Sequence, residues 1–379
     1  MQSEVLKGFK DFPKESLIRL EELKEAGTVI CGMYCIFAPV ELIHAAGIVP
    51  VGLCGKQEFP IPAAEEDLPA TLCPLIKSSY GYAVTRSCPF FDISDFILGE
   101  TTCDGKKKMF ELMADLKPLH LMHLPYSNYL SQSMDFWYAE VLRLKEFLQD
   151  WSGRRVEEEI ARQINLFNQI RSSFQEIMLL NRPDREPIPG LDLLNVLESK
   201  GVIVDPEKYL LQLKKLIKDL KAYAEYYGER TNRPRILLTG TPVGMGSEKV
   251  LRLIEELGGI VVCMENCSGI KGIYNLVDET DPDPYMAVAK RYLETPCSCM
   301  TPNNARFDQI KRSIEDFRID GVVDLSWQYC LTYHIESRSL QRALERQFNI
   351  PYIHISTDYS PTDTGQLEVR LEAFLELIN

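Results

Sequence analysis

Residues 235–267 read RILLTGTPVGMGSEKVLRLIEELGGIVVCMENC, and this stretch decides the fold class. Its apolar run Arg235–Thr239 predicts a buried strand, and Ser247–Leu257 has the apolar spacing of a helix. A second apolar run, Ile260–Met264, predicts the next strand. A strand, a helix and a strand in this order are typical of two parallel strands in a sheet that is covered by helices.

The same alternation continues to the C-terminus and also fills the first part of the chain. Further strands are predicted at Gly321–Leu325, Tyr352–Ile355, Thr28–Cys31, Ile48–Leu53, Phe96–Leu98 and Leu119–Met122. Further helices are predicted at Pro284–Glu294, Asn304–Phe317, Ser337–Gln347, Val40–Ala46 and Leu75–Val84. We therefore expect an α/β protein with one parallel-sheet lobe toward each end of the chain.

The region between the two lobes has a different pattern. In residues 127–228, apolar side chains recur at helical spacing with charges between them, as in 209–220, YLLQLKKLIKDL. The predicted domains are an N-terminal α/β lobe at 1–126, this helical segment, and a C-terminal α/β lobe at 229–379, which begins with a short linker. Because open parallel sheets carry their sites beyond the carboxyl ends of the strands, we expect two doubly wound lobes that face each other across a cleft.

Composition limits the possible partners. The chain has 379 residues and a net charge of −13, spread along its length. A nucleic-acid partner needs a basic face, so we expect none. No apolar run approaches the roughly 18 residues of a membrane span, and residues 1–12 lack the apolar core of a signal peptide. We therefore expect a cytoplasmic protein without a membrane segment.

Eleven cysteines are unusual in such a protein, because structural disulfides are rare in a reducing compartment. Cys263, inside a predicted strand, can be a small buried hydrophobe. Most of the others lie at strand ends or helix starts, on the side where the predicted lobes face each other. These are Cys31, Cys35, Cys54, Cys73, Cys103, Cys267, Cys297, Cys299 and Cys330. The helix after Cys73 carries Cys88 roughly 15–20 Å away from this side, so Cys88 is expected to be structural.

Thiols gathered in this way indicate metal ligation. Their wide spacing does not match the paired C-x₂-C motifs of zinc ribbons, and it favours an iron–sulfur cluster that is assembled by tertiary structure. Helix N-termini at Cys73 and near Asp104–Lys108 would favour thiolates and a negatively charged cluster. A zinc site and the absence of any metal remain alternatives at this point.

Three further residues are candidates for catalytic roles beside the cysteines. Glu265 and His334 could move protons at the site, and Trp327, close to Cys330, could form a wall of the cleft. The alternative for each is ordinary hydrogen bonding or packing within the fold. The glycine-rich turn at 240–249 lacks the Gly-Lys-Ser/Thr of a P-loop, so the chain itself is not expected to hydrolyse ATP.

Several of these stretches resemble the 2-hydroxyacyl-CoA dehydratase/benzoyl-CoA reductase superfamily. They are 41–47 (ELIHAAG), 72–81 (LCPLIKSSYG), 99–109 (GETTCDGKKKM) and the turn at Cys330. Within the superfamily, the chain is most similar to the double-cubane cluster proteins. That closer likeness lies in 265–269 (ENCSG), 297–302 (CSCMTP) and 357–360 (TDYS). The resemblance covers nearly the whole chain.

The resemblance implies a cofactor and its ligands. Dehydratase subunits bind one [4Fe–4S] cluster through three cysteines, at positions that match Cys73, Cys103 and Cys330. Double-cubane proteins carry two cubanes joined by a sulfide, [8Fe–9S], and therefore need three more thiolates. Cys35, Cys267 and Cys299 lie in loops on the site side, and we assign them to the second cubane. Cys297 could replace Cys299, and Cys54 is the other reserve.

The resemblance also implies partners and an activity. Electrons come from a separate ATP-hydrolysing activator with its own [4Fe–4S] cluster, the subgroup forms homodimers, and its members reduce small unsaturated molecules. The expected function is therefore low-potential reduction of a small molecule at a double-cubane cluster, driven by that activator. One alternative is a 2-hydroxyacyl-CoA dehydratase subunit with a single cluster, which the lack of a clear CoA-binding signature disfavours. The other is an electron-transfer protein without catalysis.

Overall fold

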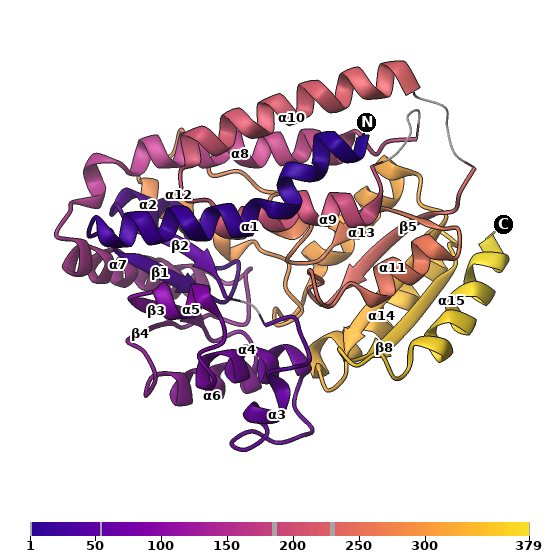
Figure 1. Cartoon of the computed structure of the whole chain (residues 1–379), viewed down its shortest axis with the longest axis horizontal. Coiled ribbons are helices and arrows are strands. Elements are labelled where there is room, and N and C mark those ends of the chain that lie inside the picture. The colour runs from indigo at the N-terminus through magenta and orange to yellow at the C-terminus, as the bar shows by residue number, and fades with distance from the viewer. Residues whose placement is uncertain (1, 54, 184–187, 228–231, 379) are drawn as a thin grey trace.

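The computed structural model describes residues 2–53, 55–183, 188–227 and 232–378. It contains two four-stranded sheets, and every strand pair in both is parallel. Figure 1 shows the two sheets beside each other, with long helices of the middle segment lying across both. The α/β class and the two parallel-sheet lobes predicted from the sequence are confirmed.

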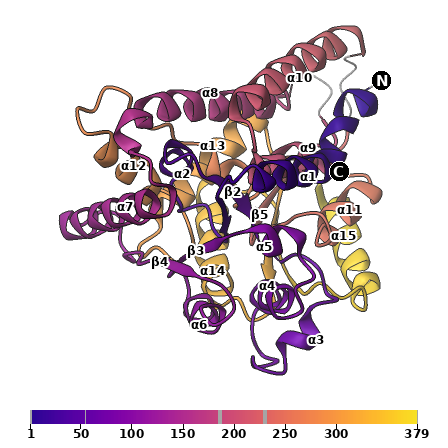
Figure 2. The same cartoon turned by 60° about the vertical axis from the view of Figure 1, so that its left-hand side comes forward.

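The N-terminal sheet has the strand order β2-β1-β3-β4. Its strands are β1 (Ile30–Met33), β2 (Val49–Gly52), β3 (Phe96–Glu100) and β4 (Leu119–Met122). Its helices are α2 (Val40–Ala45), α3 (Ile61–Ala64), α4 (Pro74–Val84), α5 (Pro89–Ile93) and α6 (Asp104–Met113). Figure 2 shows α4 and α6 on one side of this sheet and the long middle helices on the other.

The C-terminal sheet repeats the same scheme, with the order β6-β5-β7-β8. Its strands are β5 (Arg235–Gly240), β6 (Ile260–Glu265), β7 (Gly321–Trp327) and β8 (Tyr352–Thr357). Its helices are α11 (Lys249–Glu256), α12 (Pro284–Leu293), α13 (Asn304–Phe317), α14 (Leu331–Gln347) and α15 (Thr364–Ile378). The strand order reverses between β1 and β3 in the first sheet and between β5 and β7 in the second. Open parallel sheets place their ligand sites at such a reversal.

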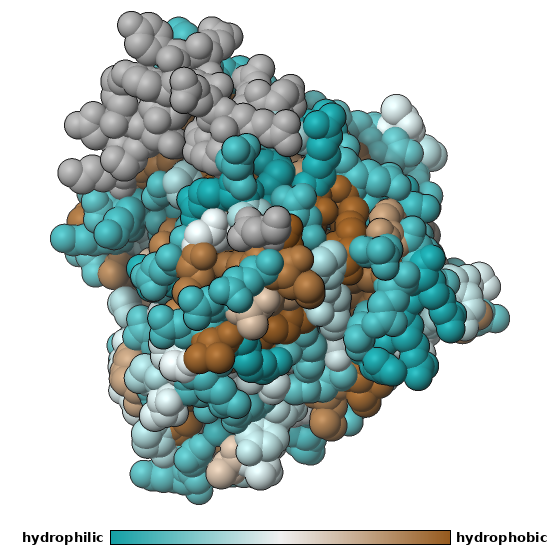
Figure 3. All heavy atoms as spheres, turned by 90° about the vertical axis from the view of Figure 1, so that its right-hand side faces the viewer, coloured by the Kyte–Doolittle hydropathy of each residue, from teal (hydrophilic) through white to brown (hydrophobic). Residues whose placement is uncertain are grey.

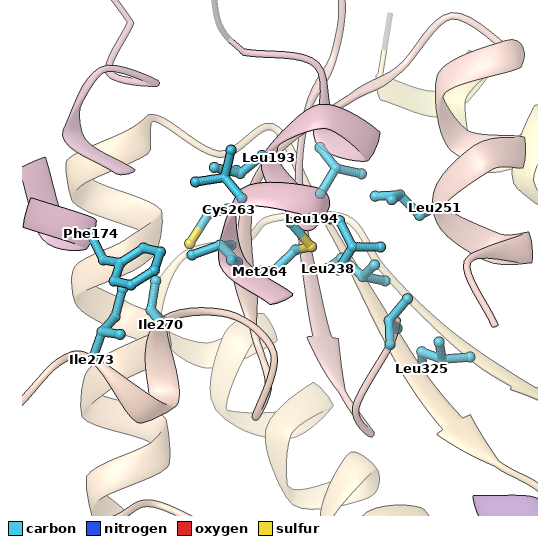
Figure 4. Packing of buried hydrophobic residues seen from close by; sticks show 14 of the residues in the cluster. Phe174, Leu193, Leu194, Leu238, Leu251, Cys263, Met264, Ile270, Ile273 and Leu325 are labelled. Carbon is cyan, nitrogen blue, oxygen red and sulfur yellow. The ribbon is translucent and has the colours of Figure 1, made fainter. Parts of the chain in front are cut away.

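Helices of the middle segment join the two lobes. They are α7 (Ser131–Ser152), α8 (Ile160–Leu179), α9 (Gly190–Glu198) and α10 (Pro206–Tyr227). Helix α12 of the C-terminal lobe packs against α7, and α9 packs against β6. Leu193 and Leu194 of α9 lie over Leu238, Cys263 and Met264, as Figure 4 shows. Cys263 is thus the buried core residue that its place in a strand predicted.

Several helices differ from the prediction. No helix was predicted at α3, α5 or α15. Helix α1 (Gln2–Glu25) was not predicted, because its apolar residues are sparse and Pro13 interrupts their spacing. Helix α14 begins directly after Cys330, six residues before the predicted start at Ser337. Its first turns hold Leu331 and Ile335, each 72% exposed, so they lack the core-facing apolar stripe that the sequence pattern requires.

The outer surface carries mixed polarity. On the face that bears the C-terminal lobe, hydrophobic residues reach the surface in patches between hydrophilic ones (Figure 3). Within the described residues, no helix combines the length and the apolar character that crossing a membrane requires.

Candidate metal centre

Three of the predicted ligands occupy equivalent local positions. Cys73, Cys103 and Cys330 are the residues directly before α4, α6 and α14, and none of their side chains caps its helix by a hydrogen bond. Each thiol therefore lies at the positive end of a helix dipole. Backbone amides at these helix starts act to lower the pKa of each thiol and so favour the thiolate, the form that binds metal, whereas burial acts in the opposite direction.

The same three thiols lie together in space. The Cys73 and Cys330 thiols share a hydrogen bond, which raises the pKa of Cys73 well above its usual 9 and lowers the pKa of Cys330. Cys103 is close enough to interact electrostatically with both of them. Residues from the N-terminal lobe and the C-terminal lobe thus meet at one point.

A second group of thiols lies next to the first. Cys35 follows β1, Cys267 follows β6, and Cys297 and Cys299 lie in the loop before α13. The Cys297 and Cys299 thiols share a hydrogen bond, which lowers the pKa of Cys297 to about 6 and raises that of Cys299. Cys35 interacts electrostatically with Cys267 and Cys297. This group contains all three predicted ligands of the second cubane, together with Cys297.

The two groups form one assembly of seven thiols. Cys297 interacts electrostatically with Cys103 and Cys330, and Cys299 interacts with Cys35 and Cys103. None of the ten described cysteines forms a disulfide. Across the described ranges, no three His, Cys, Asp or Glu side chains converge on a point that one ion would fill.

The remaining cysteines lie elsewhere. Cys31 is buried inside β1 beside Glu100, and Cys263 is buried in β6 beside Ser313. Cys88 precedes α5, at the opposite end of α4 from Cys73. Cys54, the reserve ligand, lies outside the described residues.

A cavity of about 350 Å³ reaches two of the seven thiols. Its lining includes Cys35 from the N-terminal lobe and Cys267 from the C-terminal lobe, and helices of the middle segment complete the wall. A cleft beside the cysteine turns is thus present where the sequence predicted one. Glu265, His334 and Trp327 are not among the described residues that line it.

Glu265 is a buried structural anchor for the Cys267 loop. Its carboxylate, fully buried at the end of β6, forms ion pairs with Lys271 (3.0 Å) and Arg306 (3.1 Å). Burial alone would raise the pKa of Glu265, but these two cations hold it below its usual value. Arg306 also pairs with Glu336 and lies 3.7 Å from Asp324. The network fixes the segment that carries Cys267 between β6 and α13.

Trp327 and His334 also lie outside the lining of the cavity. The Trp327 indole is buried, donates to the Pro242 carbonyl (3.0 Å) and meets the Tyr359 ring edge-on at 4.9 Å. Pro242 itself lines the cavity, so Trp327 supports that wall from behind. The half-buried His334 lies beside His354 at the exposed edge of α14 and β8, with their rings 5.2 Å apart.

Sequence reasoning missed the cations of the site. Lys271 is fully buried, contacts the Tyr333 hydroxyl at 3.0 Å and interacts electrostatically with Cys267 and Cys297. Arg306 is likewise fully buried. Nothing in one sequence separates these residues from the solvent-exposed lysines and arginines around them, because their carboxylate partners lie on other elements.

The turn after Cys267 depends on a glycine. A Cβ added at Gly269 would lie 1.8 Å from the Met264 carbonyl oxygen, whereas one added at Gly272 would first meet the Lys200 Cε atom at 3.6 Å. We expect Gly269→Ala to displace the Cys267 loop and lower the free energy of unfolding by about 2–4 kcal/mol, because a backbone atom must move. Thermal unfolding measures this, with Gly272→Ala as the matched control. Equal melting temperatures for the two variants would contradict the described turn.

Comparison with known proteins places this assembly in a family. A sequence model of the 2-hydroxyglutaryl-CoA dehydratase D-component family matches residues 35–378. The chain belongs to this family. The match spans all seven gathered cysteines and both lobes, and it confirms the superfamily that the sequence motifs indicated.

Individual relatives cover nearly the whole chain. The putative dehydratase subunit YjiM of Escherichia coli (strain K12) is 42% identical over 371 residues, which are 98% of this chain and 97% of that protein. The beta subunit of (R)-2-hydroxyglutaryl-CoA dehydratase from Acidaminococcus fermentans is 21% identical over 388 residues, 99% of each protein. One subunit of the benzoyl-CoA reductase from Thauera aromatica is 22% identical over 343 residues, 88% of this chain and 86% of that protein. The chain is therefore an enzyme component of the dehydratase and reductase type.

Proposed function

We propose that this chain reduces a small unsaturated molecule at a double-cubane [8Fe–9S] cluster that is held between its two lobes. Cys73, Cys103 and Cys330 would bind one cubane, and Cys35, Cys267 and Cys299 the other. The observation that carries the proposal is the assembly of seven thiols from both lobes. One [4Fe–4S] cluster takes four cysteine ligands at most, so a single cubane would leave at least three of these thiols unused.

The position of Cys297 favours an auxiliary role rather than a separate site. Its thiol shares a hydrogen bond with Cys299, so either residue can serve as the third ligand of the second cubane. A ligand at one of the two positions leaves the other as a neighbouring thiol. The sequence leaves the choice between Cys297 and Cys299 open, and we propose Cys299 as the third ligand of the second cubane.

The residues around the thiols suit reduction rather than hydrolysis. When bound, the cluster would supply electrons at low potential. The cavity beside Cys35 and Cys267 is lined mainly by apolar side chains, which exclude water that would otherwise compete for protons and electrons. Its volume, about 350 Å³, fits a small molecule. Lys271 interacts electrostatically with Cys267 and Cys297, and its positive charge stabilises the negative charge of a thiolate-bound cluster.

Electron delivery requires a partner in this proposal. The sequence has no P-loop, so the ATP-dependent step belongs to a separate activator ATPase with its own iron–sulfur cluster. We expect the anaerobically purified chain to reduce an alkyne such as acetylene only when that activator and ATP are present. Gas chromatography of the product measures this. Sustained reduction with ferredoxin and no ATP would contradict the proposed activator.

The proposed assembly is a homodimer, and light scattering measures it.

A dehydratase function is the second candidate, and the names of the relatives favour it. It requires one [4Fe–4S] cluster, and its reaction removes water from a 2-hydroxyacyl thioester without net reduction. Anaerobic iron analysis separates the two candidates, because about eight irons per chain supports the double cubane and about four supports the dehydratase. Loss of water from a 2-hydroxyacyl-CoA by the chain with about four irons would replace the proposed function with this one.

A further inference from the structure

One corner of the cavity beside Cys267 holds three cationic side chains, Arg171, Lys200 and Arg291, which we call the cationic corner. Arg291 donates to the carbonyl oxygens of Asn275 (3.2 Å) and Gly272. The Lys200 Cε atom lies 3.6 Å from where a Cβ on Gly272 would be. Lys200 and Arg291 therefore approach the same short segment, although one comes from the middle helices and the other from α12.

The cationic corner has more positive than negative charge. Arg171 forms an ion pair with the buried Glu41 carboxylate, which also accepts a hydrogen bond from the Tyr292 hydroxyl (2.7 Å). Neither Lys200 nor Arg291 forms an ion pair with any carboxylate of the described residues; both donate to backbone carbonyls. Glu41 and Glu294 act on Arg291 electrostatically without forming an ion pair with it. Buried charges are normally paired in direct contact, so Lys200 and Arg291 are available to an anion that enters the cavity.

The lowered pKa of Arg291 is consistent with a cation that has no anion in direct contact. Its side chain is 5% exposed, and burial, followed by the neighbouring Arg171 guanidinium, lowers its pKa to about 10. A bound anion would relieve both effects. Burial, followed by the Lys56 charge, lowers the pKa of Lys200 to about 7, and Cys267 acts in the opposite direction. Tyr292, Glu41 and Glu294 raise the pKa of Arg291, but no thiol is among the groups that act on it. The thiols therefore do not supply the charge that Arg291 lacks in direct contact.

The rest of the cavity selects the shape of the ligand. Ile36, Phe167, Ile170, Phe174 and Ile203 give it an apolar wall. A volume of about 350 Å³ is near the lower end of the roughly 300–1,000 Å³ range of small-molecule sites. It suits a molecule with a few carbon atoms and one charged group, and it is too small for a complete coenzyme A.

We propose that this cavity binds small carboxylates, with the carboxylate group at Lys200 and Arg291 and the hydrocarbon part directed toward Cys35 and Cys267. Resting on the proposed function, this makes the substrate a short unsaturated carboxylate. Its double bond takes up two electrons from the metal centre and two protons to give the saturated acid. The charged end fixes which end of the molecule approaches the thiols.

Isothermal titration calorimetry under anaerobic conditions tests this with the cluster-loaded protein. Crotonate is expected to bind, and the neutral isostere crotonamide at least about tenfold more weakly, because one ion pair to a desolvated cation is worth about 1.4 kcal/mol or more. Arg291→Met and Lys200→Met are each expected to weaken crotonate binding by about tenfold. Lys215→Met, an exposed lysine on α10, is the matched control and should leave binding unchanged.

Two further ligands separate a failure of the carboxylate site from a failure of the proposed function. Butyrate has no double bond, so butyrate binding that depends on Arg291 supports the carboxylate site even if no molecule is reduced and the proposed function fails. Crotonyl-CoA tests whether the anionic group that binds at the cationic corner is part of coenzyme A rather than a free carboxylate. Tighter binding of crotonyl-CoA than of crotonate would overturn the inference. Equal binding of crotonate and crotonamide would also overturn it. If Arg291→Met melts below the parent protein, Lys200→Gln, which keeps a donor toward the carbonyls, gives the decisive comparison.

Discussion

Replacing Cys267 by alanine is expected to lower the iron content of the anaerobically purified protein from about eight to about four per chain. Cys267 lies within the second thiol group, beside Cys35, and a cubane that loses one of three protein ligands is not retained. Cys73, Cys103 and Cys330 do not depend on it, because they stand at the starts of three other helices. The double-cubane electron paramagnetic resonance spectrum should disappear, and a single-cubane spectrum should remain.

Cys88→Ala is the matched control for this experiment. Cys88 is a half-buried thiol before α5, and the groups that act on it are Asp92 and backbone amides, with no thiol among them. Its replacement should leave iron content and spectrum unchanged and cost about 1 kcal/mol of packing. Loss of iron from the Cys88 variant, with full iron in the Cys267 variant, would contradict both the ligand assignment and the topology on which it depends.

Arg306→Met is expected to destabilise the C-terminal lobe strongly. The fully buried guanidinium holds Glu265 at 3.1 Å, approaches Asp324 at 3.7 Å and pairs with Glu336. Removing it leaves buried carboxylates without a compensating charge, which typically costs about 3–5 kcal/mol. Urea unfolding followed by circular dichroism measures the loss, and a shift of the midpoint without a change in slope identifies it as a loss of stability.

Arg312→Met gives the comparison on the same helix. Arg312 lies at the exposed face of α13, where it contacts the Tyr274 hydroxyl, so its replacement should change stability by at most about 0.5 kcal/mol. Lys271 remains beside Glu265 in the Arg306 variant, so the Cys267 loop keeps one of its two cationic anchors. If both variants unfold at the same urea concentration, the buried network does not hold the lobe together as described.

The strands could be predicted because parallel strands that are buried on both faces are continuous apolar runs. Leu119–Met122 and Asn304–Phe317 have the predicted bounds, and β7 extends two residues beyond its predicted end, to Trp327. The helix start after Cys330 could not be found, because Leu331 and Ile335 face solvent there. Local apolar spacing carries no information about such a turn.

The gathering of the thiols could be predicted because it follows from topology, whereas the charges around them could not. Cys35 and Cys103 follow strands of the N-terminal sheet and Cys267 follows a strand of the C-terminal sheet, and sites of open parallel sheets lie at such strand ends. Arg306 and Glu265 are 41 residues apart and meet only through packing of α13 on β6. Sequence spacing does not encode this contact, so the sequence alone cannot separate proton transfer from a structural role for Glu265.

The distribution of the seven thiols along the chain fixes when the site can be built. Cys35, Cys73 and Cys103 leave the ribosome early, while Cys330 emerges only after most of both lobes has been synthesised. Domains near the N-terminus fold first during synthesis. The nascent N-terminal lobe therefore presents only part of the proposed ligand set. If the cluster is bound as proposed, its ligands are complete only after β7 and Cys330 have joined the C-terminal lobe, so insertion of the cofactor would come late in synthesis or after it.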